Sequence, residues 1–350
     1  MRPLAPGATA ADGRVWRIER VWPPRGDDPR SPLEARSGGD VRGGYLDERG
    51  AVALLSEGED PRLPALRDVA PHGTVVSHRP GTRAVVRLHR DGGFAKIVRP
   101  GRAARVRNAH AQARGFDAGL RRAELVDHGF SPDEVVCAQR LPGRTLAALG
   151  EDPALDRADW ERAWRAWRTA WLAALDAPTD QGRRVHDAEA EAAVLRTWAG
   201  HASETPCADI RTAETAEGVI ARLRAAGAGP PRIAHRDLHD GQVLWHPSAG
   251  IALLDLDTCA RADPALDLGN LAAHVDLAAR QGRWSAARAA LAQTTIAGTA
   301  AAVGVGPVRL AAWRLAAAFR VACVHIMRPP SWTVARGELT RIADDLERDL

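Results

Sequence analysis

The stretch that decides the fold of this 350-residue chain is His235-Arg236-Asp237-Leu238-His239-Asp240-Gly241-Gln242-Val243-Leu244. Asp237 is followed five residues later by the carboxamide side chain of Gln242. An apolar run at residues 251–254 then ends in Asp255-Leu256-Asp257, so that Asp255 follows Gln242 by 13 residues. Phosphoryl transfer needs a carboxylate to orient the attacking hydroxyl and oxygen ligands to hold Mg²⁺ on the nucleotide phosphates. The stretch supplies the first Asp and the carboxamide, and the apolar run that follows it supplies the second Asp at its end.

At these residues the chain resembles the aminoglycoside phosphotransferase family of small-molecule kinases, which is similar to choline kinases and, more distantly, to protein kinases. The family's catalytic loop is matched by His235, Asp237, His239 and Gly241. Its metal-binding segment is matched at residues 254–257, and residues 263–268 resemble its Asp-Pro-x-x-Asp-Leu element. Three linked motifs in the right order form a specific signal, whereas a lone His-x-Asp would not. The resemblance covers roughly residues 70 to 330.

The resemblance implies an α+β fold of the two-lobe, protein kinase-like type, with a small β-rich N-lobe and a larger helical C-lobe. We predict a β-rich N-terminal extension at residues 1–65, the N-lobe with its nucleotide phosphate contacts at 66–141, and the C-lobe with the catalytic loop and acceptor pocket at 142–350. Within the extension, Asp60 is predicted to cap a short helix. The C-lobe is predicted to contain helices at 159–175, 283–303, 307–327 and 333–350.

The resemblance also implies roles for the matched residues. Asp237 is the predicted catalytic residue, which orients the acceptor hydroxyl or receives its proton. The predicted Mg²⁺ ligands are Gln242, Asp255 and Asp257. The residues predicted to support the site without touching substrate are His235, His239 and Asp267. Gln242 stands where the family usually has Asn, so its longer side chain requires a shift of the backbone or of the ion.

Lys96 is the only lysine in the chain, and a compact ammonium is not interchangeable with arginine where it meets phosphate oxygens. Residues 73–98 read as three strands joined by two turns, with Lys96 on the third strand. The resemblance implies that Lys96 contacts the α- and β-phosphates of the nucleotide, the alternative being a solvated strand lysine. The turn at Gly81 stands where the family has its phosphate-covering loop. The segment with Gln139 and Leu141 resembles the family's hinge, whose backbone groups would meet the purine edge.

The segment after Lys96 departs from the family. A helix is predicted at residues 101–122, where the family usually places an acid that pairs with the lysine. Asp117 is the only acid there, and His110 and Gln112 are neutral polar candidates. The departure puts in doubt either the register of the helix or the ion pair.

Two further patterns leave alternatives open. A helix carries Trp160, Trp164, Trp167 and Trp171 along one stripe, which indicates core packing or, alternatively, a cation–π cage for a cationic substrate. The acid-enriched segment at 178–218 indicates a solvated face or, more weakly, a preference for a cationic substrate.

Composition excludes several classes of protein. No run of 18 apolar residues occurs and the N-terminus lacks the apolar core of a secretory signal, so no membrane span is predicted. Four scattered cysteines, Cys137, Cys207, Cys259 and Cys323, fit a reducing cytoplasm. Residues 79–122 contain twelve Lys and Arg against Asp91 and Asp117. This indicates either a solvated face or a field for nucleotide phosphates, but not nucleic-acid binding, because almost no aromatic residue accompanies it.

Only eleven residues separate Asp255 from Asp267, too few for the activation segment on which a protein kinase places a peptide. The predicted function is therefore phosphorylation of a hydroxyl on a small molecule, with Mg²⁺ and ATP or GTP. An aminoglycoside, another antibiotic, an amino alcohol and a sugar all remain open as acceptors. The alternative is a degenerate, non-catalytic nucleotide-binding or interaction protein. It is supported by Gln242 in place of Asn and by the lack of an acid that could pair with Lys96 in the helix at 101–122.

Overall fold

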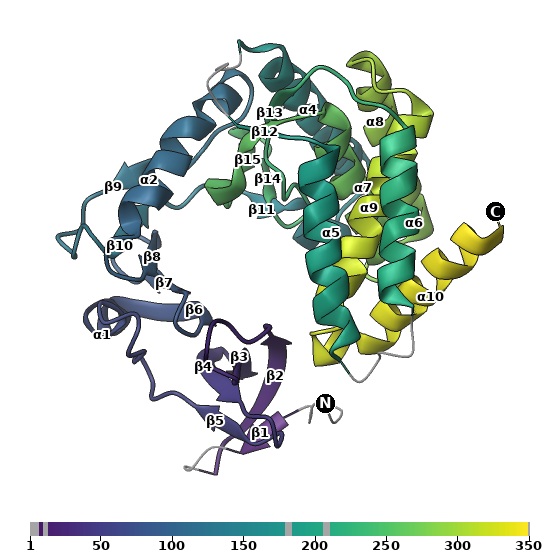
Figure 1. The fold of residues 1–350 in the computed structure, drawn as a ribbon. Helices are drawn as coiled ribbons and strands as arrows, with labels where there is room; N and C mark the ends of the chain where they lie inside the picture. The colour runs from purple at the N-terminus through teal and green to yellow at the C-terminus, as the bar shows by residue number, and fades with distance from the viewer. Residues whose placement is uncertain (1–6, 10–12, 179–183, 206–210, 349–350) are drawn as a thin grey trace.

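The computed structural model describes residues 7–9, 13–178, 184–205 and 211–348. Two β-sheets lie on the N-terminal side of the molecule and a helical lobe lies opposite them (Figure 1). The predicted two-lobe α+β fold with a β-rich N-terminal extension is confirmed. Cys207 lies outside the described residues. No helix of the described ranges is long and apolar enough to cross a membrane.

The N-terminal extension folds into an antiparallel sheet, which we call the extension sheet. Its five strands, in spatial order, are β1 (Gly7–Thr9), β2 (Val15–Val21), β3 (Ser31–Ser37), β4 (Asp40–Leu46) and β5 (Val52–Leu54). Along β2, Trp16 and Ile18 are buried between more exposed neighbours, which follows the two-residue period of a strand. A register shift between Ile18 and Arg20 changes the phase, so that Val21 is buried as well.

The N-lobe contains the second antiparallel sheet, in the order β6-β7-β8-β10-β9. Its strands are β6 (Gly73–Arg79), β7 (Arg83–Leu88), β8 (Phe94–Val98), β9 (Leu125–Val126) and β10 (Val135–Ala138). The three strands predicted within residues 73–98 are therefore confirmed. Val85 of β7 lies directly opposite Lys96 of β8, so both side chains project from the same face of the sheet.

The helix predicted at residues 101–122 is shorter than expected. The α-helix α2 (Ala103–Gln112) ends where the 3₁₀ helix η2 (Ala113–Ala118) begins. Phe116 in η2 is fully buried in the core of the helical lobe. The chain therefore leaves the α-helical path in order to bury Phe116 against the other lobe.

The short helix expected at Asp60 begins only at Leu66, as α1 (Leu66–Val69), followed by η1 (Ala70–His72). A helix begun at Asp60 would need an N–H from residue 64, and Pro64 has none. The Asp60 carboxylate instead accepts hydrogen bonds from the N–H groups of Arg62 (2.9 Å) and Gly81 (2.7 Å) and contacts His78 Nε2 (2.9 Å). It thereby ties the extension to the β6–β7 turn.

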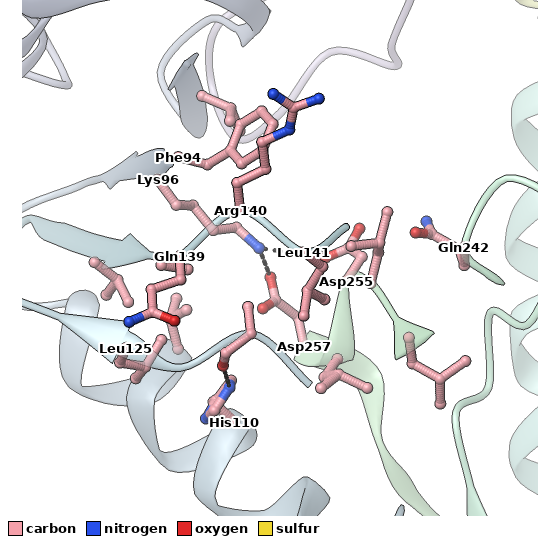
Figure 2. Close-up of a pocket in the computed structure, with 18 of the residues that line it drawn as sticks. Phe94, Lys96, His110, Leu125, Gln139, Arg140, Leu141, Gln242, Asp255 and Asp257 are labelled. Atoms are coloured by element: carbon pink, nitrogen blue, oxygen red, sulfur yellow. Dashed lines mark hydrogen bonds and ion pairs between the residues drawn. The ribbon is translucent and has the colours of Figure 1, made fainter. Parts of the chain in front are cut away.

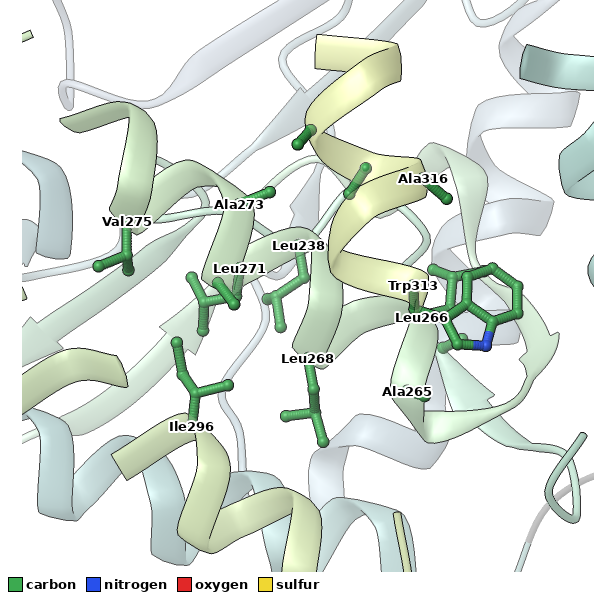
Figure 3. Close-up of a cluster of buried hydrophobic side chains, with 14 of the residues drawn as sticks. Leu238, Ala265, Leu266, Leu268, Leu271, Ala273, Val275, Ile296, Trp313 and Ala316 are labelled. Carbon is green, nitrogen blue, oxygen red and sulfur yellow. The ribbon is translucent and has the colours of Figure 1, made fainter. Parts of the chain in front are cut away.

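The helical lobe is built around α7, which is buried on nearly all sides. Its helices are α3 (Leu146–Glu151), α4 (Arg157–Asp176), α5 (Ala188–Ser203), α6 (Thr212–Ala225), α7 (Pro264–Arg280), α8 (Ala286–Ala302), α9 (Pro307–His325), η4 (Pro329–Ser331) and α10 (Trp332–Arg348). Figure 3 shows core side chains around α7, with Ile296 of α8 on one side and Trp313 of α9 on the other.

Two three-stranded sheets carry the segments that matter for chemistry. One has the order β11 (Arg144–Thr145), β14 (Val243–His246), β15 (Gly250–Leu253), and the other has the order β12 (Val185–His186), β16 (Ala260–Ala262), β13 (Arg232–Ala234). The loop between β13 and β14 is the predicted catalytic loop. The segment between β15 and β16 contains two of the predicted metal ligands, Asp255 and Asp257, and the 3₁₀ helix η3 (Leu256–Thr258), whereas Gln242 ends the catalytic loop.

The tryptophan stripe of α4 belongs to the core. Trp164, Trp167 and Trp171 are fully buried and Trp160 is 1% exposed. Their rings pack edge to face or stacked on one another, with centroids 5.4–6.2 Å apart. Because no face of the stripe is open, the packing interpretation holds and a cation–π cage for substrate does not.

Candidate active site

The predicted metal segment follows a buried strand and turns sharply. Ile251, Ala252 and Leu253 of β15 are buried, and Asp255 then adopts a φ of 48°. Left-handed backbone is uncommon for residues other than glycine, and Asp is among those that tolerate it. The turn leaves the side chains of Asp255 and Asp257 about one third exposed, at 32% and 31%, and both line the same cavity.

Asp267 of α7 anchors the catalytic loop through hydrogen bonds to its backbone. The Asp267 carboxylate accepts hydrogen bonds from the backbone N–H groups of His235 (2.7 Å) and Arg236 (2.8 Å). Arg236 has a φ of 68°, a conformation that these two bonds hold in place. Burial raises the pKa of Asp267, and the two N–H donors oppose that rise. Asn270, one turn further along α7, donates to the carbonyl of Leu238 at 2.8 Å.

The two histidines of the loop form hydrogen bonds within the loop and to its neighbours. His235 is fully buried, and its Nε2 lies 2.8 Å from the carbonyl of Leu254 beside the metal segment. His239 accepts the N–H of Gly241 at Nδ1 (3.0 Å), and its ring stacks on that of His274 with centroids 4.7 Å apart.

Asp237 lies at the surface of the loop. Its side chain is 44% exposed, and Oδ1 lies 4.0 Å from Nη1 of Arg320 on α9. The loop therefore presents Asp237 to solvent on the side of α9, while Gln242 and Asp255 line the cavity.

The cavity lies between the N-lobe sheet and the metal segment and has a volume of about 480 Å³. Figure 2 shows Lys96 extending from β8 toward the carboxylates of Asp255 and Asp257. Lys96 Nζ lies 3.3 Å from Asp255 Oδ1 and also contacts Asp257 Oδ2. Gln139 and Leu141, the predicted hinge residues, also line the cavity. Its apolar lining includes Val85, Phe94, Val106, Leu125, Val136, Ala138, Leu244 and Leu253.

Arg83 is the cation beside the metal-segment carboxylates that the sequence did not single out, and Arg140 also lines the cavity. Its Nη1 lies 3.9 Å from both Asp255 Oδ2 and Asp257 Oδ2. The period of two along β7 could have found it, because Arg83 projects from the same face as Val85, the partner of Lys96. From the basic segment at 79–122, the cations that line the cavity are Lys96 and Arg83.

The partner of Lys96 differs from the one usual in the family. No acid of α2 is available, and Asp117 forms an ion pair with Arg122, whose Nε lies 2.5 Å from Oδ1. His110 does line the cavity, but its Nε2 lies 2.7 Å from the carbonyl of Ala123. Burial lowers the pKa of His110, so it is neutral at neutral pH. Within the described residues, the acids that pair with Lys96 are Asp255 and Asp257.

Gly81 lies outside the residues that line the cavity. Its φ is +60°, and a Cβ there would come within 2.9 Å of Arg62 Cδ. The turn at Gly81 is packed against the extension in this structure, so nucleotide contact at Gly81 stays a prediction.

The donor set that Gln242 and the metal segment offer together fits a hard divalent cation. Gln242, Asp255 and Asp257 all offer oxygen atoms to one cavity, and oxygen is what Mg²⁺ prefers. Burial alone would raise the pKa of Asp255, but Lys96 and Arg83 lower it below its ordinary value. Asp255 is therefore an anion at neutral pH, as a metal ligand must be.

Comparison with known proteins gives one family match and several matches in fold. A sequence model of the phosphotransferase enzyme family matches residues 74–304, well over half of the chain. No curated protein matches the chain.

Three solved structures illustrate the likeness in fold. An aminoglycoside phosphotransferase from Streptomyces rimosus is 16% identical, with 73% of this chain and 96% of that chain covered and a TM-score of 0.51. An aminoglycoside-3'-phosphotransferase of type VIII is 18% identical, with 73% and 96% covered and a TM-score of 0.52. A thermostable mutant of an aminoglycoside phosphotransferase, in ternary complex with ADP and hygromycin B, is 13% identical, with 79% and 96% covered and a TM-score of 0.50. At such identities the likeness concerns the fold alone.

Proposed function

This chain belongs to the phosphotransferase enzyme family, and from that premise we propose that it transfers the terminal phosphoryl group of ATP or GTP, with Mg²⁺, to a hydroxyl of a small molecule. The observation that carries the proposal is the convergence of Lys96, Asp255, Asp257 and Gln242 on one cavity. Asp237 belongs to the loop that ends in Gln242, and α7 anchors that loop.

Each part of the chain has a share in the proposed reaction. We assign residues 66–141 to the contacts with the nucleotide phosphates and residues 142–350 to the catalytic loop and the acceptor. Gln139 and Leu141 border the apolar part of the cavity, which suits the face of a purine. Lys96 and Arg83 are the cations near the carboxylates, and they would meet the phosphate oxygens.

Asp237 orients the acceptor hydroxyl and takes its proton. The acceptor oxygen forms a bond to the terminal phosphorus while the bond from that phosphorus to the leaving nucleotide oxygen breaks. Gln242, Asp255 and Asp257 would hold Mg²⁺, which when bound neutralises the charge on the phosphate oxygens. Positioning and electrostatic stabilisation supply most of the rate enhancement in such a reaction. His235, His239 and Asp267 position the loop through their hydrogen bonds.

Two observations support a nucleotide and a small acceptor. Thermostable mutants of an aminoglycoside phosphotransferase with a similar fold form ternary complexes with ADP or AMP-PNP and hygromycin B. In this chain, only η3, β16 and the first residues of α7 lie between Asp255 and Asp267, so the segment offers no platform for a peptide.

The test measures ATP and GTP consumption with Mg²⁺ against hydroxylated antibiotics, amino alcohols, sugars and sugar acids. Replacing Asp237 with Asn should lower kcat by about 100-fold or more and leave nucleotide affinity within about threefold, because Asp237 does not line the cavity. Asp345→Asn, an exposed ion-pair residue on α10, is the matched control and should retain full turnover. Unchanged turnover in Asp237→Asn would contradict the assignment.

The alternative of a non-catalytic protein rests on Gln242 and on the contact of Lys96 with both carboxylates. It predicts that the wild-type protein binds nucleotide but shows no acceptor-dependent consumption. Turnover that depends on Mg²⁺ and disappears in Asp237→Asn would exclude this alternative.

A further inference from the structure

The extension sheet contacts the helical lobe close to the catalytic loop. The N–H of Val21 in β2 donates to the carbonyl of Met327, just after α9, at 2.9 Å. Trp332, at the start of α10, packs against the buried core of the extension sheet. The residues next to this hydrogen-bonded pair are Arg20 and Arg328, so the contact brings two arginines from opposite ends of the chain together.

Arg20 and Arg328 flank the Val21–Met327 hydrogen bond, and burial together with repulsion from both arginines lowers the pKa of His325. Nη1 of Arg328 lies 3.1 Å from Nε2 of His325. The pKa of Arg328 is lowered to about 10, mainly by burial and to a smaller extent by repulsion from Arg20. The other ring nitrogen of His325, Nδ1, is buried and has no hydrogen-bond partner among the described residues. Like charges held together in a partly buried place destabilise a fold unless an anion joins them.

The nearby acids do not compensate the two arginines. Asp237 and Glu34 are the acids within electrostatic range of Arg328. Glu34 Oε2 already accepts hydrogen bonds from Ser77 Oγ (2.9 Å) and from the N–H of His78 (2.8 Å). Asp237 is the proposed catalytic residue, so its carboxylate is assigned to the acceptor hydroxyl and not to the arginines. Among the described residues, neither Arg20 nor Arg328 forms an ion pair with an acid.

Arg320 lies beside the exposed carboxylate of Asp237, and attraction to the same carboxylate raises the pKa of Arg328 against the effect of burial. Arg320 approaches Asp237 to 4.0 Å and donates to Asn270 Oδ1 at 2.7 Å. None of Arg20, Arg320 and Arg328 lines the nucleotide cavity. Both Arg20 and Arg328 remain partly exposed, so a dissolved molecule can reach them.

We propose that the extension sheet completes the acceptor site and that the acceptor carries an anionic group, a carboxylate or a phosphate, which Arg20 and Arg328 bind while Asp237 faces its hydroxyl. This inference rests on the proposed phosphotransferase function. Guanidinium groups suit both anions, because their planar donors match two oxygens at once. A polycationic acceptor would meet repulsion at this place.

The acid-enriched segment at 178–218 could have favoured a cationic substrate, but its acids Glu189 and Glu217 are already paired. Glu189 and Glu217 are exposed, and each forms a two-pronged ion pair with an arginine, Arg224 and Arg196 respectively. They form a solvated, charge-paired face, and so they do not argue against an anionic acceptor.

The test is calorimetric titration of the full chain with Mg²⁺ and AMP-PNP saturating, so that the nucleotide phosphate site is filled. The probes are inorganic phosphate, gluconate and, as the cationic counterpart, glucosamine. We expect both anions to bind and glucosamine not to bind. Arg20→Gln should weaken anion binding at least about tenfold, Arg20→Lys should weaken it less, and Arg17→Gln, an exposed change on the same strand, should have no effect.

Each result decides the question. Tighter binding of phosphate indicates a phosphorylated acceptor, and tighter binding of gluconate indicates a carboxylate. The proposal fails if neither anion binds, if glucosamine binds more tightly than both, or if Arg20→Gln binds the anions as the wild type does. Because Arg20→Gln removes a repulsion, its melting temperature should not fall, which excludes misfolding as the cause. AMP-PNP binding and ATP consumption are measured separately, so a failure of the proposed kinase activity is distinguishable from a failure of the anion site.

Discussion

Replacing Asp267 with Asn tests whether the catalytic loop depends on one buried carboxylate. Asp267 is 1% exposed, and its two oxygens accept the N–H groups of His235 and Arg236. The left-handed φ of 68° at Arg236 costs a non-glycine residue about 1–2 kcal/mol. The carboxylate stabilises this conformation, because it accepts both donors at once.

The expected loss of stability follows from the hydrogen bonds. An Asn side chain has a single acceptor oxygen, and its amide group would face one of the two N–H donors. A lost hydrogen bond to a charged group costs about 1.5–3 kcal/mol, and the N–H left buried without an acceptor costs about 1–3 kcal/mol. Burial raises the pKa of Asp267, so removal of the buried charge offsets part of this loss. We expect the free energy of unfolding to fall by about 2–4 kcal/mol.

The kinetic effect should be larger than the effect on nucleotide binding. A displacement of about 1 Å at a catalytic group can lower the rate about 100-fold, and we expect that loss in kcat. The nucleotide affinity should change less than about threefold, because the cavity lining does not include Asp267. Urea denaturation and steady-state kinetics measure the two quantities.

Asp263, at the start of the same helix, provides the matched control. Its carboxylate accepts the N–H groups of Ala265 (2.9 Å) and Gly229 (2.6 Å) but forms no bond to the catalytic loop. Asp263→Asn should therefore lose stability and keep its kcat. If Asp267→Asn keeps both its stability and its kcat, the anchoring argument is refuted.

Two other predictions concern the core and the acid side of the stability curve. Trp167 is fully buried between Trp164 and Trp171. Trp167→Ala should therefore lower the free energy of unfolding by about 3–5 kcal/mol and leave the KM of the acceptor unchanged. A raised KM at unchanged stability would restore the cation–π interpretation. Burial, with Arg328 and Arg20 adding to it, lowers the pKa of His325 to about 3 against about 6.5 in the unfolded chain. Below about pH 6.5 the unfolded chain therefore binds a proton that the folded chain does not. The free energy of unfolding is highest above about pH 6.5 and falls as the pH falls toward 3, by up to about 2 kcal/mol at pH 5. Denaturation of His325→Gln between pH 7 and pH 5 should show a flatter dependence, and equal slopes in the two proteins would contradict this.

The predicted strands and chemical motifs depend on short-range patterns, which explains why the sequence was sufficient for them. The three strands at 73–98 follow from alternation and turns, and the structure has them. The end of α2 could not be predicted, because it depends on the burial of Phe116 in the other lobe. The helix expected at Asp60 was wrong because Pro64 has no N–H for it, and the Asp60 carboxylate instead meets His78 and Gly81 from a distant turn.

By itself the sequence determined which residues are candidates for the chemistry, because Asp237, Gln242 and Asp255 stand in motifs of fixed local spacing and Lys96 is the only lysine. Tertiary structure alone decided which of them meet. Lys96 and Asp255 are 159 residues apart in the chain and 3.3 Å apart in space, and Arg83 joins them from a neighbouring strand. The contact of Val21 with Met327 spans nearly the whole chain. Such contacts depend on how entire sheets and helices pack, and no local periodicity encodes them.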